Sequence, residues 1–136
     1  MTAEELFKIW NAWREIEKLR ERVQTLSAAV VSTTKIIDGV PIGTVKNGGD
    51  KVGKLSAEII DTEKKIRELE EGIEVSAKQL YNFFYKELDT RTATIMFMRY
   101  VGCRQWAEIS QVMEISERRI MELHRRAKKK LLSLTA

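Results

Sequence analysis

The side chains with the clearest capacity for chemistry are the cations in the last third of the chain. Residues 91–136 contain 10 Lys and Arg against 4 Glu, a net charge of +6, whereas residues 1–90 contain 14 Lys and Arg against 16 Asp and Glu. Ammonium and guanidinium groups bind phosphates through charge-assisted hydrogen bonds, so this asymmetry favours a polyanionic partner. A basic helix that only improves solubility is the alternative. Seven of the cations lie close together: Arg118, Arg119, Arg125, Arg126, Lys128, Lys129 and Lys130.

The other reactive side chains form no catalytic or metal-binding pattern. His124 and Cys103 are single residues of their kinds, which excludes an internal disulfide and supplies no nucleophile with its base. Carboxylate pairs such as Glu70 and Glu74 lie among Lys and Arg, as on solvated helix faces. We therefore expect a protein that is not an enzyme and that uses no cofactor and no metal ion.

Hydropathy and the first residues bear on the compartment. The chain has no window of 18 consecutive apolar residues, so we expect no transmembrane span and no membrane partner. The opening sequence MTAEELFKIW is acidic and lacks the apolar run of a signal peptide. Together with the single Cys, these features predict a cytoplasmic protein.

Apolar residues repeat at helical spacing in two long segments. The first, 3–32, is expected to begin with Thr2 as N-cap and Glu5 completing a capping box. The second, 51–88, is expected to begin with Asp50 as N-cap, and it carries its stripe for about four heptads. The segments are predicted to pack as an antiparallel hairpin. The stripe positions are Leu6, Ile9, Trp13, Ile16, Leu19, Val23, Leu26 and Val30, and then Val52, Leu55, Ile59, Thr62, Ile66, Leu69, Ile73, Ser76, Leu80 and Phe83.

The residues between the two segments are rich in glycine. The connector, 34–50, contains four Gly and the chain's one Pro, and residues 35–50 are predicted to form a loop. A short β-hairpin turning at Asp38 and Gly39 is the alternative. A helical hairpin that exposes aromatic side chains could also form a homodimer through its long helices. The aromatic residues expected at its surface are Trp10, Tyr81 and Phe84.

The last third of the chain has shorter elements. We predict helices over 90–101, 105–113 and 117–132, with Gly102 at the C′ position of the first and Ser116 as N-cap of the last. Short helices joined by a turn of about three residues are typical of a helix-turn-helix. The sequence therefore predicts an all-α fold, with an N-terminal antiparallel helical hairpin over 1–88 and a C-terminal three-helix helix-turn-helix domain over 89–136.

This last segment resembles a known family. Residues 88–131 resemble region 4 of sigma-70-type transcription factors, and the addition of a helical hairpin and a Gly-rich connector resembles small phage and prophage regulators of the ArpU/RinA type. The residues that carry the first resemblance are Leu88, Asp89, Met98, Arg99, Tyr100, Trp106, Glu108, Ile109, Ser116, Arg119, Ile120, Leu123, Ala127 and Leu131.

The resemblance implies roles for individual side chains. It makes the helix that follows Ser116 the recognition helix, which enters the DNA major groove. Met121 stands where region 4 often has a polar base-reading residue, so specificity for the promoter −35 element does not follow. Glu114 stands where Gly is common, and a left-handed conformation there would cost about 1 kcal/mol. The implied base-facing residues are Glu117, Arg118, Met121, Glu122 and Arg125. The implied phosphate-facing residues are Arg104, Gln105, Lys128, Lys129 and Lys130.

The resemblance also implies a function. It implies sequence-specific binding to double-stranded DNA in transcription regulation, of phage or prophage genes in a bacterial cell, with RNA polymerase as a further partner. One alternative is a protein-interaction module that docks on RNA polymerase, and another is a phage DNA-packaging subunit similar to a small terminase. Two side chains have expected places: Trp106 in the core of the helix-turn-helix, and His124 either beside a phosphate or exposed to solvent.

Overall fold

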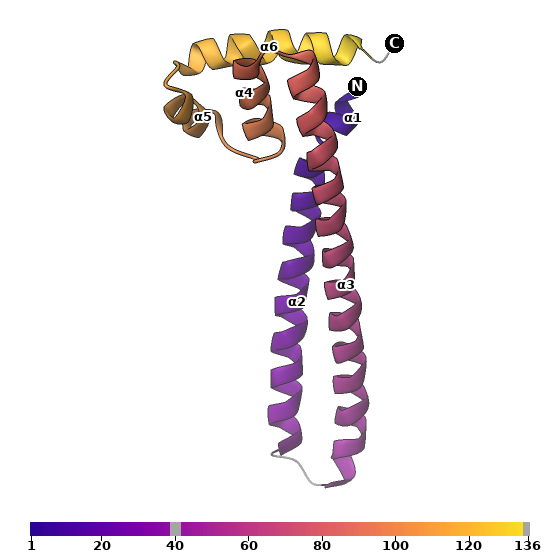
Figure 1. Cartoon of the computed structure of the whole chain (residues 1–136). Helices are drawn as coiled ribbons and strands as arrows, with labels where there is room; N and C mark the ends of the chain where they lie inside the picture. The colour runs from indigo at the N-terminus through magenta and orange to yellow at the C-terminus, as the bar shows by residue number, and fades with distance from the viewer. Residues whose placement is uncertain (39–41, 135–136) are drawn as a thin grey trace. The chain divides into compact units, whose positions relative to one another are not determined.

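The computed structural model describes residues 1–38 and 42–134, which are helical throughout apart from short turns (Figure 1). No strand occurs among these residues, and the predicted all-α fold is confirmed. The chain forms two compact units, one of residues 14–70 and one of residues 1–13 together with 71–136. The helices are α1 (Ala3–Leu6), α2 (Lys8–Asp38), α3 (Ile42–Glu87), α4 (Thr90–Tyr100), α5 (Trp106–Met113) and α6 (Glu117–Ser133).

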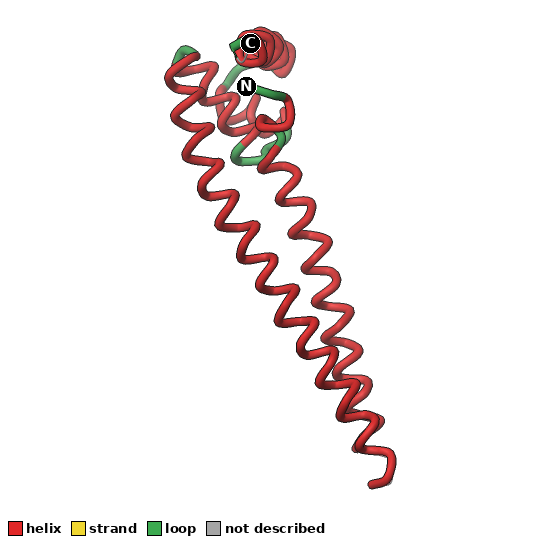
Figure 2. The backbone as a smooth tube through the Cα atoms, turned by 90° about the vertical axis from the view of Figure 1, so that its right-hand side faces the viewer, coloured by secondary structure: helices red, strands yellow, loops and turns green. Residues whose placement is uncertain are grey.

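The unit of residues 14–70 is built from the adjoining parts of α2 and α3. These parts run side by side in opposite directions, as Figures 1 and 2 both show. Ile16, Leu26 and Ile66 are buried, and Thr62 fills a further buried position of the stripe. The predicted antiparallel helical hairpin is therefore present, and its stripe faces inward because apolar residues at steps of three and four share one helix face.

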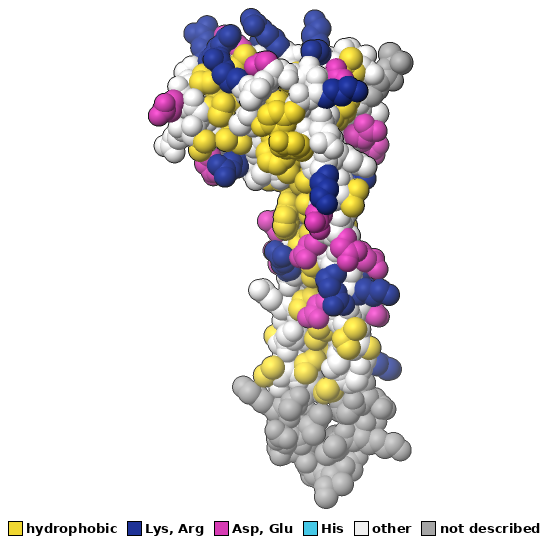
Figure 3. All heavy atoms as spheres, in the orientation of Figure 1, with side chains coloured by type: hydrophobic (Ala, Val, Ile, Leu, Met, Phe, Trp, Pro, Cys, Tyr) yellow, Lys and Arg dark blue, Asp and Glu magenta, His cyan; other side chains and the backbone are white. Residues whose placement is uncertain are grey.

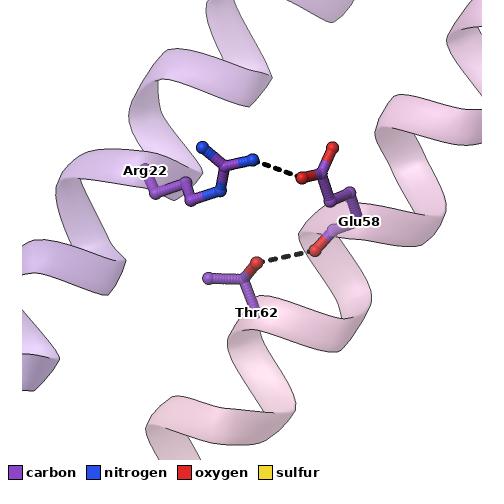
Figure 4. Close-up of polar contacts among 3 residues, drawn as sticks. All are labelled: Arg22, Glu58 and Thr62. Carbon is purple, nitrogen blue, oxygen red and sulfur yellow. Dashed lines mark hydrogen bonds and ion pairs between the residues drawn. The ribbon is translucent and has the colours of Figure 1, made fainter.

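Polar contacts also join the two helices of this unit. Arg20 Nη2 lies 3.2 Å from Glu70 Oε1, and Arg22 is paired with Glu58 (Figure 4). The Thr62 hydroxyl donates to the Glu58 carbonyl oxygen at 2.7 Å, so its polar group is satisfied inside its own helix. Exposed ion pairs contribute at most about 1 kcal/mol each, so the apolar stripe supplies most of the stability of this unit.

The predicted loop over 35–50 is wrong wherever the structure describes the backbone. Helix α2 continues to Asp38 and α3 begins at Ile42, so Asp50 lies inside a helix and is not its N-cap. Helix growth adds one hydrogen bond for each residue fixed, and this offsets a cost of about 1 kcal/mol for each Gly. The alternative β-hairpin is excluded for 35–38 by the helix, and its turn at 39–41 lies outside the described residues.

The N-terminal helix also differs from its prediction. Thr2 and Glu5 form the expected capping box, but α1 ends at Leu6 and α2 starts at Lys8. Phe7 between them has φ −92° and ψ 6°, and its ring packs edge-to-face on Tyr100 with centroids 5.3 Å apart. The Asn11 N–H still donates to the Phe7 carbonyl at 2.9 Å, so the helical hydrogen bonding crosses the break.

The second unit has two apolar clusters. In the smaller one, Ile95, Ile109 and Ile120 bring α4, α5 and α6 together. Two of the aromatic residues predicted at the hairpin surface differ in their exposure. Tyr81 is 49% exposed, whereas Phe84 is fully buried, so the predicted exposure of Phe84 is wrong. The larger cluster contains Met1, Leu6, Ile9, Leu80, Phe84, Ala93, Met96, Tyr100, Ala127 and Leu131.

The turn after α4 places Gly102 at the expected C′ position. Its N–H donates to the Phe97 carbonyl at 3.0 Å, while the left-handed conformation falls on Cys103, with φ 51°. A Cβ atom on Gly102 would lie 2.8 Å from the Met98 carbonyl oxygen. Close approach of two backbone segments, and not a positive φ, therefore requires glycine at this position.

Alanine at two glycines is expected to have opposite effects. Gly102→Ala should lower the free energy of unfolding by about 1–3 kcal/mol, because its Cβ would force the turn apart. Gly72→Ala should raise it by about 0.5–1 kcal/mol, because Gly72 lies inside α3 with no atom within 4 Å of the added Cβ. Urea unfolding followed by circular dichroism measures both. If both substitutions changed the free energy of unfolding by the same amount, the close contact between Gly102 and the Met98 carbonyl oxygen would not contribute to stability.

Candidate nucleic-acid interface

The turn between α5 and α6 has the geometry of a helix-turn-helix. Glu114 adopts the left-handed conformation, with φ 55° and ψ 40°, and its N–H donates to the Ser110 carbonyl. The Ser110 hydroxyl donates to the Ile115 carbonyl, which closes the turn from the other side. Ser116 is the N-cap of α6, as predicted, and its hydroxyl accepts from the Arg119 N–H at 3.3 Å. These contacts fix where α6 starts.

Helix α6 is held by its apolar face along its whole length. Ile120 is fully buried in the cluster with α4 and α5, and Leu123 packs against that cluster. Ala127 and Leu131 are buried in the larger cluster, beside residues of α1, α2 and α3. The apolar face predicted for this helix is therefore buried, which leaves its charged side chains outward. Figure 3 shows Lys and Arg side chains gathered along α6.

Most of the predicted base-facing residues lie on the outer face of α6. Glu117, Arg118 and Arg125 are exposed, and Met121 is 39% exposed. Glu122 differs, because it is half-buried and its carboxylate lies 3.1 Å from Arg119 Nη1. All five side chains thus keep exposed surface, and Glu122 is in addition paired with Arg119 within its own helix.

The predicted phosphate-facing residues differ in how far they are exposed. Arg104 and Gln105 are exposed at the start of α5, where Gln105 is the N-cap without a side-chain capping bond. Lys129 is exposed on α6, whereas the Lys128 ammonium lies 5.5 Å from the centroid of the Phe7 ring.

Lys130 makes a contact within the protein, and its expected contact with a phosphate stays a prediction. Its ammonium donates to the Glu87 carbonyl at 2.6 Å, the position where α3 ends. A cation at a helix C-terminus complements the partial negative charge of the last carbonyls. Lys130 therefore ties α6 to α3, and both Lys130 and its neighbour Lys129 are exposed.

A shallow groove of about 400 Å³ runs along the outer part of α6. Its walls combine cations with apolar carbon atoms. The lining residues are Met121, His124, Arg125, Lys128, Lys129 and Leu132. An anionic ligand with apolar parts fits this combination.

The aromatic network beside α6 was not predicted from the sequence. The Arg99 guanidinium lies between two indole rings, 4.7 Å from the centroid of Trp10 and 4.4 Å from that of Trp106. Trp10 Nε1 donates to the Arg99 carbonyl at 2.8 Å. Trp106 packs against the small apolar cluster, as expected for a core residue. No local spacing signals these contacts, because Trp10 and Arg99 are 89 positions apart.

His124 belongs to the same network, so it is half-buried and not a plain solvent-exposed side chain, while its expected approach to a phosphate stays a prediction. Its Nε2 shares a hydrogen bond of 2.5 Å with the Tyr100 hydroxyl, and its ring packs against Trp106 with centroids 4.6 Å apart. Burial, followed by the charges of Lys128 and Arg99, lowers the pKa of His124 to about 4. Burial also raises the pKa of Tyr100 to about 12. The pair is therefore neutral at physiological pH and positions α6 without adding charge to its surface.

Comparison with known proteins gives one result for this unit. Residues 86–131 match the family model described as Sigma-70, region 4. The region 4 match covers α4, α5 and nearly all of α6, the helices that form the helix-turn-helix. It indicates DNA binding in transcription regulation. No curated protein and no solved structure matches the chain.

No helix among residues 1–38 and 42–134 is long and apolar enough to cross a bilayer. The long helices α2 and α3 carry charged residues between the positions of their apolar stripes, which is typical of helices that pack on one face only.

Acid should destabilise the protein through His124. An unfolded His takes up a proton near pH 6.5, whereas folded His124 does so only near pH 4. The unfolded state therefore binds more protons between these values, and the free energy of unfolding falls as pH falls through this range. Urea unfolding at several pH values should give a flatter dependence for His124→Gln than for the wild type. The carboxylates titrate in both proteins, so parallel curves would contradict the role of His124.

Proposed function

We propose that the protein regulates transcription by binding specific sequences in double-stranded DNA through α6. The observation that carries this proposal is the exposed cationic face of α6, on a helix that starts at a fixed turn and is buried along its other side. The region 4 match of residues 86–131 supports the same conclusion.

The dimensions of the interface agree with this proposal. A helix about 10–12 Å across fits a major groove about 12 Å wide. Arg118 and Arg125 lie two turns apart on the exposed side of α6 and can each present a guanidinium fork to guanine. Arg104 and Gln105 at the start of α5, together with Lys129, would contact phosphates and fix the register.

The finer assignments are also proposals. The layout of a helical hairpin followed by a region 4 segment supports a phage or prophage regulator acting in the bacterial cytoplasm. The protein would act by binding and not by catalysis. The hairpin would mediate homodimerisation or contact RNA polymerase, and a dimer would read two half-sites one helical turn apart.

One surface favours protein docking as a second candidate function. A groove of about 320 Å³ beside the exposed Tyr81 is lined almost entirely by apolar atoms. Its lining residues are Ala77, Lys78, Tyr81, Asn82 and Phe97. Docking on RNA polymerase would use such a surface. A ring-shaped oligomer in solution would instead favour the DNA-packaging alternative.

Binding to duplex DNA should depend strongly on salt. If about four or more phosphates are contacted, the logarithm of the association constant should fall against the logarithm of salt concentration with a slope of about −4 or steeper. A mobility-shift titration at several salt concentrations measures the slope. A flat response would overturn the DNA proposal and favour protein docking.

Arginines and lysines of α6 should contribute differently to binding. Arg118→Ala and Arg125→Ala should each reduce preference for the selected sequence, with a cost of about 1–3 kcal/mol on that sequence. Lys129→Ala should weaken binding to all sequences alike and make the salt slope shallower by about one unit. Lys129 is the matched cation because it is exposed on the same helix. Identical behaviour of the three variants would contradict the division into base and phosphate contacts.

A further inference from the structure

Met121 is an apolar side chain on the charged side of α6. It is 39% exposed, and it belongs to neither of the apolar clusters that hold this helix. The apolar residues of α6 that hold the helix in place are Ile120, Leu123, Ala127 and Leu131. The packing of the protein therefore does not account for methionine at position 121.

The neighbours of Met121 are the groups that we propose to meet base edges. Arg118 precedes it by three residues and Arg125 follows it by four, so all three side chains share one face of the helix. Met121 and Arg125 also line the same shallow groove. If the two arginines enter the major groove, Met121 must lie against the base pairs between the positions that they contact.

The base edges in the major groove offer few apolar partners. Guanine, cytosine and adenine present hydrogen-bond donors and acceptors there, while thymine adds its 5-methyl group. A thioether side chain forms no strong hydrogen bond, and its flexible, polarisable chain suits contact with a methyl group. Placing it over a cytosine amino group would leave that donor without a partner.

We propose that Met121 is a specificity-determining residue that selects thymine by contact with the 5-methyl group, between the positions read by Arg118 and Arg125. This inference rests on the proposed function, because it requires α6 to lie in the major groove. It gives the preferred target a T·A pair that no hydrogen-bonding residue of α6 reads.

The size of the effect follows from the area buried. Removing one methyl group from an apolar contact costs the affinity about a factor of four, since a buried CH₂ group is worth about 0.8 kcal/mol. Deoxyuridine is a suitable probe, because it keeps the pairing of thymine and lacks only the methyl group.

The experiment uses the full chain and duplexes obtained by in vitro selection. Each thymine of the best-bound duplex is replaced in turn by deoxyuridine, and Kd is measured for the wild type, for Met121→Gln and for Leu134→Gln. Gln matches Met in length and helix propensity. Leu134 is the control, because it is 46% exposed but lies beyond the end of α6.

The expected result is a thymine in the site bound by α6 whose replacement weakens wild-type binding about fourfold. The same replacement should have no effect on Met121→Gln, while Leu134→Gln should behave like the wild type. Selected duplexes without any methyl-sensitive thymine, or a Met121→Gln variant that keeps the sensitivity, would overturn the inference and leave the DNA-binding proposal intact. Selection that enriches no sequence would overturn both.

Discussion

Everything that α6 can present to a partner depends on the burial of its opposite face. Ile120 and Leu131 are fully buried, and each contributes about 1.5–3 kcal/mol relative to exposure. They lie three turns apart and in different clusters, so the helix is fixed at two points and cannot rotate about its axis. Because the rotation of α6 is fixed, the same side chains always face outward, and these include Arg118, Met121 and Arg125.

A second set of contacts joins the start of the chain to this arrangement. The Arg99 guanidinium between Trp10 and Trp106 links α2, α4 and α5, and stacked cation–π contacts of this kind contribute about 0.5–2 kcal/mol. The Tyr100 and His124 pair extends the network to α6. Polar groups therefore help to set the position of α6, in addition to its buried apolar face.

Local signals in the sequence account for much of the fold. The stripes of α2 and α3, the Ser116 cap and the apolar face of α6 were predictable, because each depends on residue types at fixed short spacing. The connector was not, because the glycine signal around residues 42–50 was weaker than helix propagation. In the candidate site, the exposed residues of α6 follow from helical periodicity. The contact of Lys130 with Glu87 and the partial burial of His124 depend on contacts between distant segments, which no local pattern encodes.

The second unit is made of two segments that are far apart along the chain, and this affects how it can fold. Residues 1–13 and 71–136 share one core, and residues 14–70 separate them along the chain. On the ribosome, Leu6 and Ile9 emerge long before their partners Ala127 and Leu131 have been synthesised. The intervening helices have to bring the ends of a long loop together before this core can close, and contacts of such sequence separation slow folding. Competence for a ligand of α6 is therefore acquired only after α6 has been synthesised and packed on this core, and a nascent chain that lacks α6 leaves the core without Ala127 and Leu131.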